Sequence, residues 1–263
     1  MKPPFIRRLG IAALLTLAAV GWTQEQGTDN GREFHWTGRL SPDQVVVIKD
    51  INGDIDAAGS SGSDQVEVTA VKSGEGAEDV KIRVVKLNDG VEICALYPGF
   101  FNSENCESNS HFGNSHNNAK VHFTVRMPRN LRFTGKNVNG GVEAEHMGRY
   151  VEASSVNGSI RLSTESWATA SSVNASIDAR IVRAEWSGNL EFKTVNGSIK
   201  FELPANLNAD LDFKSVNGHL DSDFPLTVQG SSRHSVHGTV GSGGRSLEIK
   251  TVNGSGDLRK GTV

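Results

Sequence analysis

One short phrase, Ser/Thr-Val-Asn-Gly-x-Ile, recurs through the second half of this 263-residue chain. Clear copies begin at Ser155, Thr194 and Ser215, and an outlying copy spans Ile51 to Ile55. From residue 139 onward, the Asn position recurs in steps of 18, 17, 22, 21, 20 and 16 residues. The seven positions concerned are Asn139, Asn157, Asn174, Asn196, Asn217, His237 and Asn253. A period near twenty residues is typical of stacked repeats, in which each unit buries its apolar face against its neighbours.

The residues around each phrase indicate how the chain turns. Apolar residues alternate up to Phe192, and they alternate again from Ile199 onward, but with the opposite parity. A flat strand cannot change parity without exposing apolar side chains. A bend at the Ser/Thr-Val step would keep both sets inside. It would place the Val and Ile of each phrase in the core, with the hydroxyl residue at the bend.

The Asn-Gly pair leaves two architectures open. Asn-Gly is the strongest signal for a two-residue hairpin turn, and serial hairpins would form a meander or a barrel. The pair also suits the tight corner of a coil, where Asn side chains of successive coils can stack. The regular period and the repeated change of parity favour the coil.

The sequence therefore predicts an all-β fold, a single-stranded right-handed β-solenoid resembling a β-helix, with coils of about twenty residues. We expect Gly158, Gly197 and Gly218 to have positive φ, where a Cβ is penalised. The predicted structural corners are Asn139, Gly140, Asn157, Gly158, Asn174, Asn196, Gly197, Asn217, Gly218, Asn253 and Gly254.

The N-terminal residues predict an export signal. Lys2, Arg7 and Arg8 precede an apolar stretch of 12 residues, Leu9 to Val20, which is short for a membrane span. We expect residues 1–21 to be a cleaved signal peptide, with an uncleaved anchor as the alternative. Cleavage would leave 24 basic and 30 acidic residues. That acidic balance argues against a nucleic-acid partner. The export signal predicts the periplasm, the outer envelope or the extracellular space.

The rest of the chain divides by pattern. Residues 22–44 form an N-terminal lead-in. Residues 45–130 are expected to be the N-terminal β part of the solenoid, with period-two strands interrupted by an Asn- and Ser-rich loop insertion at 97–119. Residues 131–263 form the repeat solenoid. Cys94 and Cys106 are the two cysteines, and an even count in an exported chain predicts a disulfide, with two free thiols as the alternative.

These motifs together resemble a known family. The phrase Val-Asn-Gly-x-Ile, the early Asn52-Gly53-Asp54-Ile55 and the later Val121–Pro128 strand are similar to the exported bacterial putative-adhesin family of unknown function (DUF4097-like, related to toastrack domains). The resemblance covers the chain from Val45 onward. It implies a β-solenoid in or outside the cell envelope and offers no catalytic residues to transfer. The Asn- and His-rich loop with its two cysteines departs from the family pattern.

Two groups of residues are candidates for chemistry or binding. His111 and His116 could ligate zinc or copper, but their spacing matches no compact site, and a solvated loop is the simpler interpretation. We therefore predict no cofactor. Trp167 and Trp186 could form platforms for sugars or proteins, although closing the core at the end of a coil is their more ordinary role.

Charged residues on the outward strand positions look like an evenly mixed, solvated face with no cluster of three carboxylates. The sequence thus favours a non-enzymatic exported protein that offers a rigid surface for binding or adhesion to a protein, a glycan or another copy. A membrane contact is expected only through an uncleaved signal. The alternatives are a polysaccharide-active enzyme on a β-helix scaffold and an envelope-stress sensor module, which the toastrack resemblance suggests.

Overall fold

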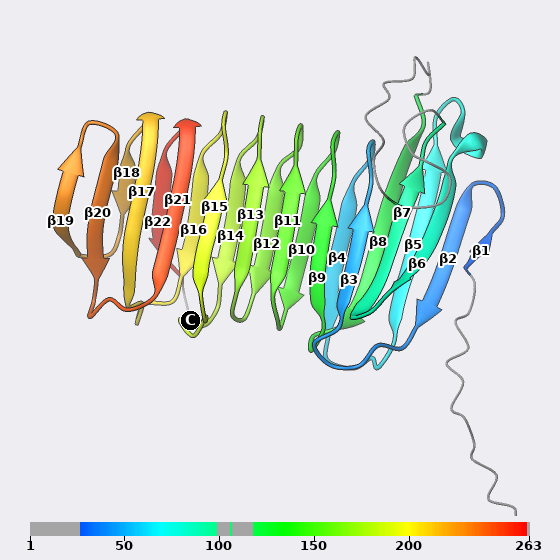
Figure 1. Ribbon diagram of the computed structural model, residues 1–263, viewed down its shortest axis with the longest axis horizontal. Helices are drawn as coiled ribbons and strands as arrows, with labels where there is room; N and C mark the ends of the chain where they lie inside the picture. Colours follow the sequence, from blue (N-terminus) through cyan, green and yellow to red (C-terminus); the bar gives the residue numbers. More distant parts are fainter. Residues whose placement is uncertain (1–26, 99–105, 107–117, 262–263) are drawn as a thin grey trace, which may run out of the picture.

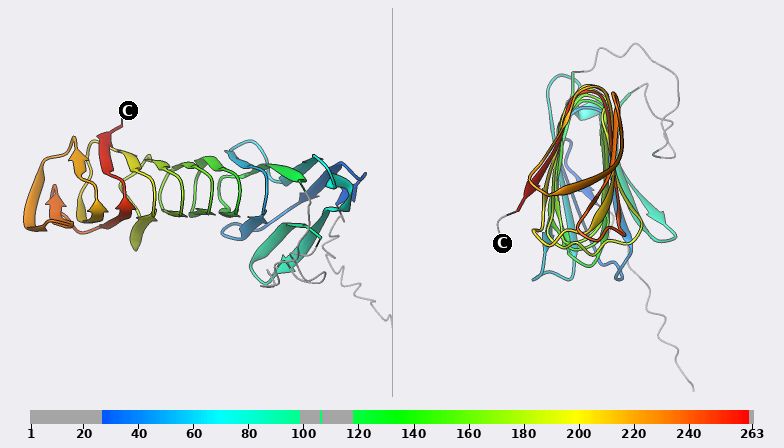
Figure 2. Two further views of the ribbon diagram at one scale, coloured as in Figure 1. Left: turned by 90° about the horizontal axis from the view of Figure 1, so that it is seen from above. Right: turned by 90° about the vertical axis from the view of Figure 1, so that its left-hand side faces the viewer.

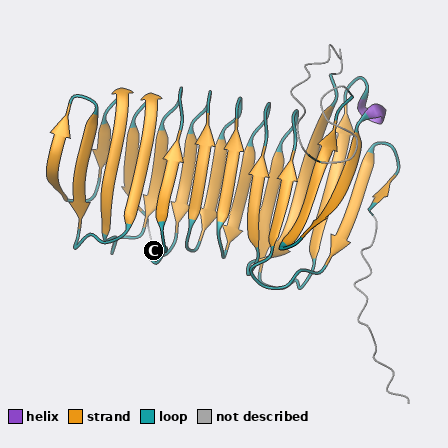
Figure 3. Ribbon diagram, viewed as in Figure 1, coloured by secondary structure: helices purple, strands orange, loops and turns teal. Residues whose placement is uncertain are grey.

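The computed structural model describes residues 27–98, Cys106 and residues 118–261, and almost all of its regular structure is β-strand (Figures 1 and 3). The strands form two sheets of eleven, which face each other along an elongated body (Figure 2). One turn of 3₁₀ helix, η1 (Ala77–Asp79), is the exception. The all-β solenoid expected from the sequence is confirmed. The hand of its winding remains a prediction.

Within each sheet, the spatial order of the strands differs from their order along the chain. Sheet A contains, from one end to the other, β1 (Thr28–Asp29), β2 (Glu33–Gly38), β5 (Val66–Ser73), β8 (Lys120–Pro128), β4 (Ile55–Ser60), β10 (Val142–Met147), β12 (Ile160–Thr164), β14 (Ile177–Ile181), β16 (Ile199–Leu203), β22 (Gly256–Lys260) and β18 (Leu220–Ser222). Sheet B contains β19 (Leu226–Ser232), β20 (Ser235–Val240), β17 (Ala209–Asn217), β21 (Ser246–Asn253), β15 (Asn189–Lys193), β13 (Ala168–Ser172), β11 (Val151–Ser155), β9 (Arg132–Lys136), β3 (Val45–Lys49), β7 (Gly90–Leu96) and β6 (Lys81–Leu87).

Each coil supplies one strand to each sheet. The chain runs along β11 in sheet B, makes a tight turn at Asn157, and returns along β12 in sheet A. Equivalent residues of successive coils pair in parallel register, as Val151 does with Ala168 and Ile160 with Ile177. Their inward side chains fill the space between the sheets and build a continuous core along the solenoid.

The coils depart from chain order near both ends. The last coil, β21–β22, lies between β15–β16 and β17–β18. The first coil, β3–β4, likewise lies between strands β7 and β8 on one side and strands β9 and β10 on the other. The copy of the phrase around His237 is also not a corner, because it forms β20, which runs antiparallel to β17.

The structure corrects the predicted corner. Ser155 is not at a bend but is the last inward residue of β11, and it is buried like its equivalents in the other coils. The following valine faces solvent, with Val156 37% exposed and Val216 54% exposed. The change of parity occurs across the whole turn, residues 156–159, so the phrase contributes its hydroxyl residue and its Ile to the core but not its Val.

The glycines of the phrase are needed for a different reason from the one predicted. Positive φ occurs at Gly53 and Gly140, but Gly158, Gly197 and Gly218 are not among the positive-φ glycines. Instead, a Cβ on Gly197 would lie 2.2 Å from the carbonyl oxygen of Ala175 in the preceding coil. The coils therefore approach too closely at this turn for a large side chain, and Ala175 itself is the largest residue found at this place.

We expect Gly197→Val to lower the free energy of unfolding by about 2–3 kcal/mol, because the added side chain must push two coils apart. In a domain of this size, that loss corresponds to a fall in melting temperature of roughly 5–10 °C. Lys200→Ala, on the exposed face of β16, is the matched control and should change the melting temperature little. Equal shifts in the two variants would contradict the close approach of the coils.

Candidate binding surface

The flattened solenoid has two long edges of different construction. The turns that lead from sheet B to sheet A contain the Asn-Gly pairs, and we call this side the Asn edge. The turns that lead back from sheet A to sheet B form the return edge. In the end-on view the turns of the Asn edge superpose closely, and the body tapers toward them (Figure 2). The Asn edge is thus a narrow, straight ridge.

A ladder of side-chain amides runs along the Asn edge. From Asn157 onward, each Asn donates a hydrogen bond from its Nδ2 to the Oδ1 of the Asn in the adjacent coil, with distances between 2.7 and 2.9 Å. At the near end, Asn52 donates to the carbonyl of Ala119 instead. The rungs follow spatial rather than chain order: Asn139, Asn157, Asn174, Asn196, Asn253 and Asn217.

A second ladder lies inside the same turns. The buried hydroxyl of Ser155 donates to the carbonyl of Gly140, and Thr194 and Thr251 donate to carbonyls in the same way. Because a buried hydroxyl without a partner is costly, each of these bonds fixes the distance between two coils. At the corner residues Gly158, Gly218 and Gly254, an added Cβ would lie between 1.8 and 1.9 Å from a carbonyl oxygen of the adjacent coil.

An exposed row of valines accompanies the amide ladder, and we call it the valine row. Its members precede the ladder residues in the sequence and are between 37% and 54% exposed. The described residues include nine exposed large hydrophobic side chains, and six of them belong to this row. In spatial order the row contains Val138, Val156, Val173, Val195, Val252 and Val216.

The outer face of sheet B carries charges in rows of one sign. Strand register places Glu191 beside Glu248 and Glu248 beside Asp212, while the lysines two residues further on form a parallel row. This corrects the expectation that no three carboxylates align, which failed because the last coil inserts between two earlier ones. Each carboxylate pairs with its own lysine, and the hydrogen bond from Lys250 is the main cause that lowers the pKa of Glu248. In the described part of the chain, no group of three or more His, Cys, Asp or Glu side chains could hold a metal ion.

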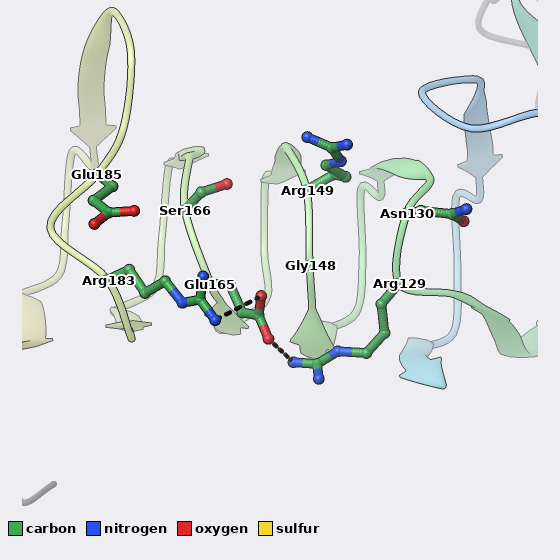
Figure 4. A pocket seen from close by; sticks show the side chains of 8 residues that line it. All are labelled: Arg129, Asn130, Gly148, Arg149, Glu165, Ser166, Arg183 and Glu185. Carbon is green, nitrogen blue, oxygen red and sulfur yellow. Dashed lines mark ion pairs between the residues drawn. The ribbon is translucent and has the colours of Figure 1, made fainter. Parts of the chain in front are cut away.

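A shallow hollow of about 390 Å³ lies on the return edge (Figure 4). Arg129 and Arg183 reach toward Glu165 from two sides, at 2.7 and 4.0 Å, whereas Arg149 points away and lies 3.4 Å from Asp43. All three guanidinium groups therefore already face carboxylates. The ion pairs that line the hollow connect successive turns of the return edge, so we assign them a structural role.

The two predicted tryptophans differ in environment. Trp186 is 4% exposed and donates its indole N–H to the carbonyl of Ser246, so it packs in the core and offers no face to a ligand. Trp167 is half-buried beside Tyr150, with ring centroids 4.7 Å apart, and its indole N–H bonds to Asn189. A binding role remains open for Trp167 alone.

The other predicted site residues lie near the loop at 97–119. Cys94 and Cys106 form the expected disulfide, which is therefore confirmed. His111 and His116 lie outside the described residues, as does the predicted signal peptide at 1–21.

The structure also contains a buried carboxyl group that the sequence did not suggest, one residue after Lys49, which pairs in register with Cys94. Asp50 precedes the first turn of the Asn edge, at the place that Asn137 occupies in the next coil and that Ser or Thr occupies from Ser155 onward. It is 4% exposed, accepts a hydrogen bond from the Tyr97 hydroxyl at 3.0 Å, and has no partner among the described residues for its Oδ2. Burial, supported by the negative charge of Asp54, raises the pKa of Asp50 to about 7.

The fold and this surface define a class of protein, a two-sheet β-solenoid with an asparagine ladder along one edge. Residues 41–259 match the model of the Toastrack family DUF4097, and the chain belongs to that family. No curated protein sequence matches it significantly. None of the described helical segments has the length and apolarity that a membrane crossing requires.

Solved structures that match this chain share little sequence with it. A putative cell adhesion protein from Clostridium sporogenes is 12% identical, with 87% of this chain and 100% of that chain covered and a TM-score of 0.45. A putative adhesin from Bacteroides fragilis is 11% identical, with coverages of 86% and 97% and a TM-score of 0.32. A putative lipid binding protein from Parabacteroides distasonis is 8% identical, with coverages of 88% and 98% and a TM-score of 0.24. At these scores, the likenesses carry no argument about function.

We expect an Asn at the end of the amide ladder to contribute less to the free energy of unfolding than an Asn in its middle, because it makes fewer inter-coil hydrogen bonds. Asn174→Ala removes two inter-coil hydrogen bonds and should lower the free energy of unfolding by about 1–2 kcal/mol. Asn217→Ala removes one such bond and should cost roughly half as much. Denaturant unfolding of both variants measures the difference. A larger loss from Asn217→Ala would contradict the ladder.

Asp50 should make stability depend on pH. Its folded pKa of about 7 lies above the ordinary value of 3.8, so the folded state retains a proton that the unfolded chain releases. The stabilisation is complete below pH 3.8 and is lost as the pH rises to about 7. Asp50→Asn should abolish this slope and be more stable than the unmodified protein at pH 8, by roughly 2–4 kcal/mol. Thermal melting of both proteins from about pH 4 to pH 8 tests this. Parallel pH profiles would show that Asp50 is not the titrating group.

Proposed function

We propose that the chain is a non-enzymatic exported protein of the cell envelope or the extracellular space, and that its Asn edge is a binding surface for a protein or glycan partner. The observation that carries this proposal is the valine row, which is aligned coil by coil with the amide ladder. Exposed apolar side chains gathered in one continuous feature are typical of interaction sites, whereas isolated ones are not.

The chemistry of the Asn edge suits an extended partner. Neighbouring strands in a sheet are about 4.8 Å apart, so six coils present their valines over a straight line of roughly 25 Å. Each amide in the middle of the ladder uses one N–H and one lone pair within the ladder, which leaves a second donor and acceptor outward. A long partner could therefore make the same apolar and polar contact at each coil, while the rigid core below keeps these groups in place.

Removing valine side chains from the middle of the row should weaken partner binding without unfolding the protein. The triple variant Val156→Ser, Val173→Ser and Val195→Ser is expected to bind roughly 10–100-fold more weakly, because three apolar contacts are lost. Val182→Ser is the control, since Val182 is 50% exposed and lies on the return edge. Binding is measured against immobilised cell-wall polysaccharides, extracellular polysaccharides and envelope proteins.

The same panel tests the enzymatic alternative. Polysaccharide chain length is followed with and without calcium, and shortening would contradict a non-enzymatic role and direct attention to the charged rows of sheet B. If the triple variant bound as tightly as the control, the Asn edge would not be the binding surface.

A further inference from the structure

The Asn edge has three properties that together restrict its partner. It repeats at the spacing of β-strands, it contains no charged side chain in the valine row or the amide ladder, and each of its amides presents both a donor and an acceptor. A partner that makes equivalent contacts over all six coils must repeat at the same spacing. A stack of parallel strands meets that condition.

A second copy of this chain has the same spacing by construction. Rows of identical side chains in stacked strands can interdigitate along their whole length, and stacked amides add to such contacts. Antiparallel contact of two Asn edges, related by a two-fold axis, would bring valine row against valine row and ladder against ladder. Neutral, self-complementary rows can approach in this way without repulsion between like charges.

The flanking charges do not oppose this contact. The lysines beside the valine row on sheet B, Lys193, Lys214 and Lys250, are each paired with a carboxylate on their own sheet. The row of small polar residues on the other side is already ordered across coils, since Ser176, Ser198 and Ser255 accept hydrogen bonds from neighbouring backbone N–H groups. These lysines and serines on the two sides of the Asn edge therefore already have partners within their own copy and need none from a second copy.

We propose that two copies of this protein associate through their Asn edges in antiparallel orientation. This inference rests on the proposed function, because it assigns the partner of that surface to a second copy of the chain. A strip roughly 25 Å long and one or two side chains wide buries well under the roughly 1,200 Å² typical of a stable complex. The dimer is therefore weak and reversible, and it forms at high micromolar concentration.

Sedimentation equilibrium of the full-length protein, without any other macromolecule, tests the association. The unmodified protein should shift from monomer to dimer between roughly 10 µM and 1 mM. Val173→Asp should weaken the association at least roughly tenfold, because it places an unpaired carboxylate against the apolar valine row of the second copy, while Val182→Asp on the return edge should leave it unchanged. A protein that remains monomeric throughout, or an association that Val173→Asp does not weaken, would overturn the proposal.

Cross-linking tests the orientation with milder substitutions. The two native cysteines are bonded to each other, so a single added cysteine is the free thiol in each variant. Antiparallel contact predicts that Val138→Cys, at one end of the row, forms a disulfide with Val216→Cys, at the other end, when the two variants are mixed. Preferential linkage of Val138→Cys to itself would overturn the antiparallel arrangement. Binding to envelope polymers that persists in a strictly monomeric protein would contradict this inference while leaving the proposed function in place.

Discussion

The structure depends on hydrogen bonds that join each coil to the next at a single turn. Three sets lie side by side in that turn: amide to amide outside, backbone to backbone within the turn, and hydroxyl to carbonyl inside. All three require the same spacing between coils, so a change in one disturbs the others. This requirement explains the recurrent phrase. Ser or Thr supplies the hydroxyl bond, Asn supplies the amide bond, and Gly allows the backbones of adjacent coils to approach closely.

This constraint also explains why valine is exposed. The valine follows a hydroxyl residue that points into the core, so the valine itself points to solvent. The equivalent valines of the two adjacent coils are one strand spacing away. A β-branched side chain suits such an extended backbone and packs against its equivalents in adjacent coils. The row that results is apolar, straight and uniform, which gives the Asn edge a surface chemistry that neither sheet face shares.

The sequence predicted the features that depend on short segments, and it did not predict those that depend on pairing between distant segments. The period, the turn residues and the disulfide depend on short segments, and the solenoid followed from them. The direction of Val156 was mistaken because a parity change over a turn of four residues resembles a change at one bend. Asp50 and the alignment of Glu191 with Glu248 and Asp212 were missed because both depend on which coils are neighbours. That order is set by pairing between distant segments, for which the phrase carries no signal.

The insertion of β21–β22 between two earlier coils has a consequence for how the molecule can be assembled. A solenoid stacked in chain order can grow as it is synthesised, each coil resting on the last. In this chain, β17 and β18 cannot join the rest of the solenoid until residues 246–260 have emerged, because those residues form the layer between them and β15–β16. The far end of the solenoid therefore closes in one late step. A chain shortened before residue 246 would lose the attachment of β17 and β18 to the rest of the solenoid, rather than one coil from its end.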